Sequence, residues 1–96
     1  MSPLNKKKLN LLRKKLDNLD NELIKLIKKR STFVNQVLKL KEYKKEIVDQ
    51  KRINIILKKI KKKSIKSKID PKITYRIWKN MIWSFIDFER RNFKKK

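Results

Sequence analysis

Three basic residues, Arg13, Arg30 and Lys41, lie at in-phase positions of an apolar stripe that repeats with helical spacing from Leu12 into the forties. A guanidinium or ammonium group is costly to desolvate alone, so basic side chains on a core-facing stripe require buried carboxylates or an anionic ligand as partners. The chain has nine acidic residues against 31 basic ones. The three cations are therefore interpreted as groups that bind a small anion.

Helix geometry limits which of these cations can share one ligand. At 1.5 Å per residue, Arg30 and Lys41 are about 16 Å apart along the axis, a gap that two long side chains can span around a small dianion. Arg13 is about 25 Å from Arg30 on the same helix, too far to contact the same small molecule. If Arg13 contributes, it comes from a second copy packed antiparallel, so the spacing predicts a dimer with shared sites.

Each cation also has a plainer interpretation. Arg13 can extend to solvent from the edge of the stripe, and Lys41 can be a solvated lysine at a helix end. Arg30 can form a structural ion pair with Asp20 or with an acid of a partner chain. The arrangement of several charges in phase, rather than any one of them, favours a binding site.

The missing residue types exclude several kinds of site. The chain has no cysteine and no histidine, which excludes thiol chemistry, Ser-His triads, a histidine general base and metal sites built from these ligands. We therefore expect no cofactor and no metal. No segment has the length of an apolar membrane span, and the first residues lack an apolar signal region. A soluble cytoplasmic protein is the expectation.

The formal net charge of +22 would ordinarily indicate nucleic acid or an anionic membrane as a partner. However, lysine supplies 25 of the 31 basic residues, and lysine, isoleucine and asparagine fill 46 of the 96 positions. All three have A/T-rich codons, so genome base composition is the preferred explanation. A basic helical dimer that coats RNA or DNA is the alternative from another class, and non-specific nucleic-acid binding is expected as a side effect of charge.

Helices must position these residues. With no glycine and two prolines, the chain predicts one all-α domain over residues 1–96. The first helix begins near Ser2-Pro3 and runs to about Lys41. It would exceed 50 Å, so it cannot bury its whole stripe within its own chain.

Two shorter helices follow a charged connection over residues 42–48. Asp49 is an N-cap for a helix from Gln50 to about Lys63, and residues 61–68 are expected to form a solvated turn. Asp70-Pro71 repeats the cap-plus-proline signal and begins a third helix that ends near Phe93. Glu89 lies in phase with apolar residues of that helix.

The spacing of these residues resembles the all-helical chorismate mutases. The matching positions extend from about residue 9 to residue 93 and comprise Leu12, Arg13, Leu16, Leu19, Asp20, Leu23, Leu26, Ile27, Arg30, Val37, Lys41, Asp49, Arg52, Tyr75, Arg76, Met81, Ile82, Phe85, Ile86 and Glu89. Members of this family form intertwined helical homodimers in which each active site borrows one arginine from the neighbouring chain. The resemblance implies three helices, a homodimer and an enzyme of phenylalanine and tyrosine biosynthesis in the shikimate pathway.

The resemblance also assigns roles to charged residues. Arg13, lent across the dimer, and Arg30 of the home chain would hold the carboxylates of chorismate. Lys41 would reach a carboxylate and the ether oxygen, and Arg52 would line the pocket. Glu89 matches the glutamine or glutamate that donates a hydrogen bond to the ether oxygen.

Of three further pocket positions, one matches the pattern of the family and two differ from it. Asp49 would lie near the ring hydroxyl. Ile53 stands where most mutases have a glutamate for that hydroxyl, and Phe85 takes a place often occupied by serine. The step from Lys41 to Arg52, with an apolar residue next, also resembles the isochorismate pyruvate lyase branch of the same fold. Chorismate mutase is the first interpretation, and the lyase remains the alternative.

Overall fold

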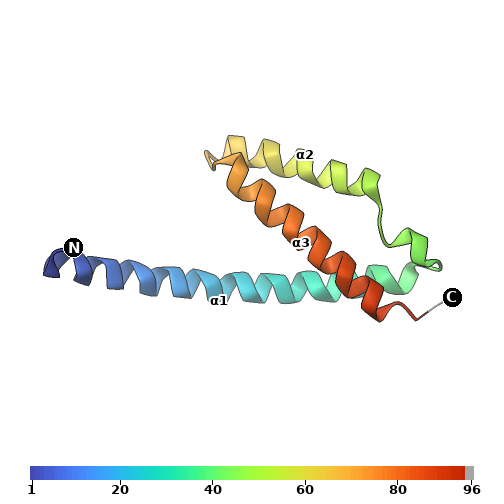
Figure 1. Ribbon diagram of the computed structural model, residues 1–96, viewed down its shortest axis with the longest axis horizontal. Coiled ribbons are helices and arrows are strands. Elements are labelled where there is room, and N and C mark those ends of the chain that lie inside the picture. The colour runs from blue at the N-terminus through green and yellow to red at the C-terminus, as the bar shows by residue number, and fades with distance from the viewer. Residues whose placement is uncertain (95–96) are drawn as a thin grey trace. The chain divides into compact units, whose positions relative to one another are not determined.

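A computed structural model describes residues 1–94 of the chain, and the regular elements in that range are helices without strands. The elements are the helix α1 (Pro3–Leu40), the short 3-10 helix η1 (Lys44–Glu46), α2 (Gln50–Lys66) and α3 (Pro71–Asn92) (Figure 1). The prediction of an all-α fold, with one very long N-terminal helix and two further helices, is confirmed. None of the helices in this range combines the length and the hydropathy that a membrane span requires.

Side-chain caps begin all three α-helices at the predicted residues. The Ser2 hydroxyl accepts the backbone N–H of the residue three positions later at 3.2 Å. Asp49 accepts the backbone N–H of Arg52 at 3.0 Å, and Asp70 accepts the N–H two positions later at 2.9 Å. Each cap satisfies an N–H group that has no partner within its own helix. Local sequence therefore determines where these helices begin.

The predicted turn over residues 61–68 is wrong, because α2 continues to Lys66. Ser64 is buried at 3% exposure, and its hydroxyl donates to the Ile60 carbonyl at 2.6 Å and pairs with the Thr74 hydroxyl at 2.7 Å. This buried polar contact ties the last turns of α2 to α3 and keeps the segment helical. The connection is left with only four residues, 67–70.

The turn itself closes with Lys68 in the left-handed region, at φ 58°. The backbone N–H of Ile69 bonds to the Ser64 carbonyl at 2.9 Å, and that of Lys68 bonds to the Ile65 carbonyl at 3.1 Å. These two bonds form a Schellman motif, in which glycine is the usual left-handed residue. The chain contains no glycine, so a lysine holds this position.

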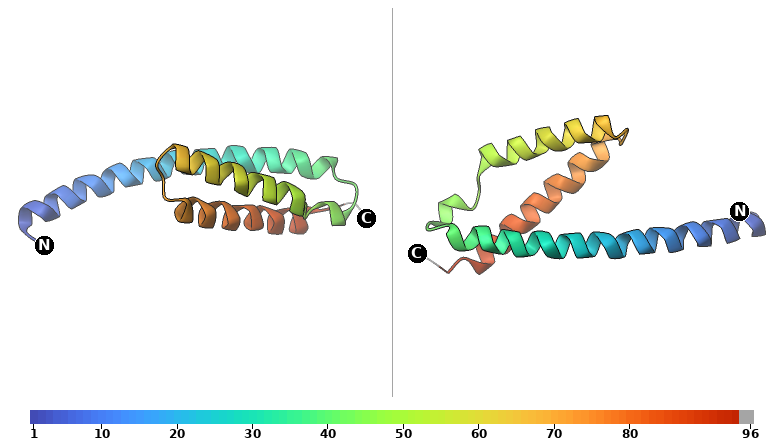
Figure 2. Two further views of the ribbon diagram at one scale, coloured as in Figure 1. Left: turned by 90° about the horizontal axis from the view of Figure 1, so that it is seen from above. Right: turned by 180° about the vertical axis from the view of Figure 1, so that it is seen from behind.

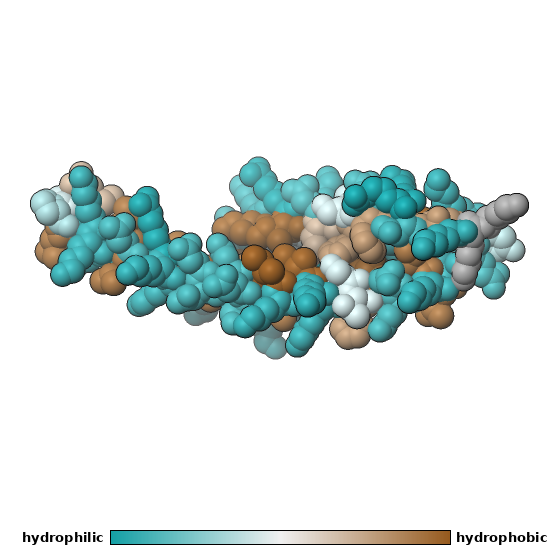
Figure 3. Space-filling view, turned by 90° about the horizontal axis from the view of Figure 1, so that it is seen from below, coloured by the Kyte–Doolittle hydropathy of each residue, from teal (hydrophilic) through white to brown (hydrophobic). Residues whose placement is uncertain are grey.

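The chain divides into two compact units, and the first, residues 1–33, consists of the N-terminal part of α1. The apolar stripe of this unit is about half exposed or more, at 58% for Leu16, 54% for Leu23 and 48% for Ile27. Apolar brown surfaces at the N-terminal end of the chain are visible at the left of Figure 3. A stripe of this kind is stabilised by packing rather than by helix propensity. Its exposure agrees with the expectation that the chain does not bury it alone.

The second unit begins at Val34 and contains the hydrophobic core. Here α2 and α3 contact one another as a helical hairpin (Figures 1 and 2). The buried core residues come from the last turn of α1, the connection, α2 and α3, and they are Leu38, Ile47, Ile53, Ile82 and Ile86. This small core fixes the end of α1 against α3, and it therefore determines where the charged residues beside it lie.

Candidate active site

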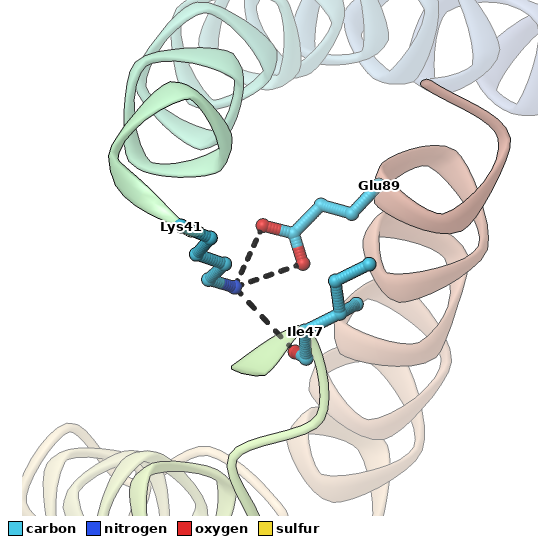
Figure 4. Close-up of polar contacts among 3 residues, drawn as sticks. All are labelled: Lys41, Ile47 and Glu89. Carbon is cyan, nitrogen blue, oxygen red and sulfur yellow. Dashed lines mark hydrogen bonds and ion pairs between the residues drawn. The ribbon is translucent and has the colours of Figure 1, made fainter. Parts of the chain in front are cut away.

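A largely buried ion pair joins Lys41 to Glu89. The ammonium nitrogen Nζ of Lys41 donates to Oε1 of Glu89 at 3.0 Å and to Oε2 at 3.2 Å, and it lies 3.5 Å from the Ile47 carbonyl oxygen (Figure 4). The side chains of Lys41 and Glu89 are only 17% and 7% exposed. Removing one partner of such a pair leaves an uncompensated charge in a nearly dry site. The pair is therefore a polar centre within the second unit.

The neighbouring core explains why these two side chains meet. Glu89 follows Ile82 and Ile86 by seven and three residues, so all three share the buried face of α3. Lys41 comes directly after α1, and its backbone N–H bonds to the Leu38 carbonyl at 3.1 Å. Because Leu38 and Ile86 belong to the same core, packing brings the end of α1 to the last turns of α3.

The pair can act on an oxygen atom of a ligand. An ammonium group offers three donors, and a protonated carboxyl group offers one. Two donors aimed at an oxygen that gains negative charge stabilise it strongly when water is excluded. In the structure the two groups instead satisfy each other. A ligand oxygen must therefore share or replace part of that contact.

Asp49 and Arg52 lie together at the start of α2, where both are exposed. One carboxylate oxygen of Asp49 accepts the backbone N–H of Arg52, so that carboxylate is held in place by the cap it makes. The Arg52 guanidinium lies on an exposed position of the helix and is available to a carboxylate ligand.

The two predicted apolar pocket residues differ in burial. Ile53 is 6% exposed and packs in the core with Ile47 and Ile86. Phe85 is half-buried on α3, four residues before Glu89. Neither offers a polar group to a ring hydroxyl, in agreement with the departures noted in the sequence.

Arg13 and Arg30 belong to the first unit, residues 1–33. Arg13 is exposed, whereas Arg30 is partly buried. The structure thus brings Lys41 and Glu89 into contact and places Arg52 beside Asp49. The roles of all these residues toward a substrate remain predictions.

The Ile47 carbonyl is a feature of the site that sequence reasoning missed. Ile47 is 3% exposed, and its carbonyl oxygen faces the Lys41 ammonium group (Figure 4). Every residue carries a backbone carbonyl, so this contact cannot be predicted from the type of residue. The signal that the sequence offers is a charged connection that ends in two adjacent apolar residues, Ile47 and Val48.

A groove of about 360 Å³ lies elsewhere in the second unit, between α2 and α3. Four apolar or aromatic residues and three lysines line it, namely Leu57, Ile60, Pro71, Tyr75, Lys58, Lys61 and Lys72. None of the predicted site residues is among them. The groove is therefore separate from the Lys41–Glu89 pair.

These features define an all-helical protein with a buried cation–carboxyl centre and with neither histidine nor cysteine. The sequence model of one family, described as chorismate mutase type II, matches residues 12–90. The chain belongs to this family, and it is an enzyme of the isomerase class with chorismate mutase function. Comparison with curated proteins and with solved structures gives no match.

Proposed function

We propose that this chorismate mutase converts chorismate to prephenate at the Lys41–Glu89 pair, with both side chains directed at the ether oxygen whose bond breaks. The single observation that carries the proposal is the pair itself. It is a nearly buried ammonium group 3.0 Å from a nearly buried carboxyl group, and both residues lie within the range 12–90 that the family model matches.

The conversion of chorismate to prephenate requires only the kinds of group that this site offers. It is a unimolecular Claisen rearrangement, in which the ether C–O bond breaks while a new C–C bond forms within the same molecule. It needs no nucleophile, because no group is transferred to the enzyme. What the protein supplies is a folded, chair-like substrate conformer and donors for the negative charge that develops on the ether oxygen. A lysine and a protonated Glu89 are two such donors.

Arginines complete the proposed site by holding the two carboxylates of the substrate. Arg30 of the home chain and Arg13 of the partner subunit are the two candidates, and Arg52, exposed beside the Asp49 cap, would line the pocket. The guanidinium fork binds a carboxylate through two parallel hydrogen bonds. Arg13 is proposed to come from a partner subunit, and Asp49 is proposed to lie near the ring hydroxyl.

A homodimer follows from the same proposal. The stripe of the first unit that carries Leu16, Leu23 and Ile27 is half exposed, and a second copy of the same stripe is a suitable cover for it. An antiparallel arrangement of two copies would bring Arg13 of one to the site of the other. We place the enzyme in the cytoplasm, within the synthesis of aromatic amino acids.

Direct assay of the purified full chain tests the proposal. Chorismate should disappear as prephenate forms. Lys41→Met should lower kcat/KM by about 10²-fold or more, because it removes a donor to the developing oxyanion. Lys44→Met is the matched control, since Lys44 is an exposed lysine of the same connection, and it should stay within about twofold. Equal activity of the two variants would contradict the role of Lys41.

A second candidate, isochorismate pyruvate lyase, is favoured by the burial of Ile53. At 6% exposure in the core, this residue offers nothing to the ring hydroxyl that most mutases bind at its position. Incubating the enzyme separately with chorismate and isochorismate, and following prephenate, salicylate and pyruvate, separates the two. Prephenate from chorismate supports the mutase, and salicylate with pyruvate from isochorismate supports the lyase.

A further inference from the structure

The segment from Gln50 to Ile69 carries nine basic residues and no acidic one. In contrast, acids interrupt the basic residues of the other helices, as with Asp17 and Asp20 in α1 and Asp87 in α3. A/T-rich codons explain why lysine is abundant throughout the chain. They do not explain why this one helix lacks acids, because aspartate occurs on both sides of it.

The basic residues of α2 are concentrated on the side opposite its buried face. Ile53 and Ser64 mark the buried face. With 3.6 residues per turn, the opposite side carries Lys51, Lys58, Lys62 and Lys66, and all four are exposed. The outward face of α2, defined by these four lysines, therefore carries a row of positive charges and no negative one.

Nothing in residues 1–94 neutralises this face. The ion pairs found there are Lys25–Glu22, Lys41–Glu89 and Arg90–Asp87, and none reaches the outward face of α2. Lys58, Lys62 and Lys66 follow one another at four-residue spacing, and like charges at that spacing destabilise a helix. A bound polyanion would relieve this repulsion.

We propose that the outward face of α2 binds the phosphate backbone of duplex nucleic acid without sequence preference. Lys51 and Lys66 are about 22 Å apart along the helix axis, the length of roughly six base pairs. The partner is a duplex because α2 has no aromatic residue, whereas proteins that bind single strands stack bases on aromatic rings. Lysines neutralise phosphates as point charges and lack the arginine fork that reads base edges.

Salt-dependent binding of the full chain to two unrelated 20-base-pair DNA duplexes tests this proposal. The test variant carries Lys58→Gln, Lys62→Gln and Lys66→Gln. The matched control carries Lys6→Gln, Lys7→Gln and Lys8→Gln, which remove the same charge from exposed positions of α1. None of the six lysines belongs to the proposed active site, so unchanged prephenate formation verifies that both variants are folded.

We expect DNA binding to weaken more in the α2 variant than in the α1 control. The slope of log K against log salt should fall by nearly three for the α2 variant and by less than one for the control, since each lost phosphate contact contributes about 0.9. Both duplexes should bind equally well. Similar losses in the two variants would overturn the proposal in favour of diffuse attraction, and polyglutamate competing as well as the duplex would indicate an acidic protein partner instead. Either failure leaves the mutase assignment unaffected.

Discussion

The ammonium group of Lys41 lies within 3.2 Å of both carboxylate oxygens of Glu89, although 48 residues separate the two in the chain. The contact joins the end of α1 to the last turns of α3 and is almost closed to solvent. In this contact the Glu89 carboxylate occupies the cation that a substrate oxygen would use. The chemical nature of the side chain at position 89 therefore affects both groups of the proposed site at once.

Glu89→Gln should retain mutase activity, whereas Glu89→Ala should lower kcat/KM by about 10²-fold. The amide N–H of glutamine donates a hydrogen bond to the ether oxygen, and the amide oxygen still accepts from Lys41. Alanine offers neither group. The measurement is kcat/KM for prephenate formation by the two variants and the unaltered enzyme.

Asp87→Ala is the control for that experiment, since Asp87 is an exposed carboxylate on the same helix. Its kcat/KM should stay within about twofold of that of the unaltered enzyme. If Glu89→Gln lost as much activity as Glu89→Ala, hydrogen-bond donation at this position would have no part in the chemistry.

Mixing two inactive variants should restore activity if Arg13 is supplied by the partner subunit. Arg13→Ala and Lys41→Ala each damage both sites of their own homodimer. A mixed dimer has one site with Lys41 from the first variant and Arg13 from the second, and that site is intact. Random exchange of subunits should return about a quarter of the unaltered activity. The measurement is prephenate formation after denaturing and refolding the mixture.

A mixture of Lys41→Ala with Glu89→Ala is the matched control. These two residues belong to one chain's site, so no mixed dimer regains both, and the mixture should stay inactive. Recovery there but not with Arg13→Ala would show that the sharing of residues between subunits differs from the proposed one.

The sequence predicts the helices well because their signals are local. Ser2, Asp49 and Asp70 cap the helices that they were expected to begin. The end of α2 was placed too early, because a run of lysines and serines indicates a turn. Only tertiary structure reveals that Ser64 is buried against Thr74. The turn also lacks a glycine, the residue that usually marks its left-handed position.

The candidate site was predictable in part, for a related reason. Glu89 was singled out because a charge occupied a buried helical register, and its burial at 5% exposure agrees with that logic. Its contact with Lys41 depends on how α1 ends against α3, which a core of five residues decides. The Ile47 carbonyl could not be predicted, because backbone groups have no sequence signature.

Asp49 should have two roles where Asp70 has one. Both cap a helix by accepting a backbone N–H, at 3.0 and 2.9 Å, so alanine at either position should lower the free energy of unfolding by about 1 kcal/mol. Only Asp49→Ala should also raise KM for chorismate, because only Asp49 is proposed to lie near the substrate. Urea denaturation and steady-state kinetics on both variants measure the two effects. Equal KM values would confine Asp49 to its structural role.

Lys68→Gly should stabilise the enzyme without changing its activity. Lys68 has φ 58°, a conformation that costs a non-glycine residue about 1–2 kcal/mol, whereas glycine adopts it freely. Part of that gain is offset because glycine adds freedom to the unfolded chain, so the net increase should be about 0.5–1 kcal/mol. Lys68→Ala removes the same charge but retains a Cβ atom, and it should gain little. Urea unfolding at one fixed protein concentration compares the three proteins, since the stability of a dimer depends on concentration. If alanine and glycine raised the midpoint equally, charge repulsion rather than backbone strain would be the cause.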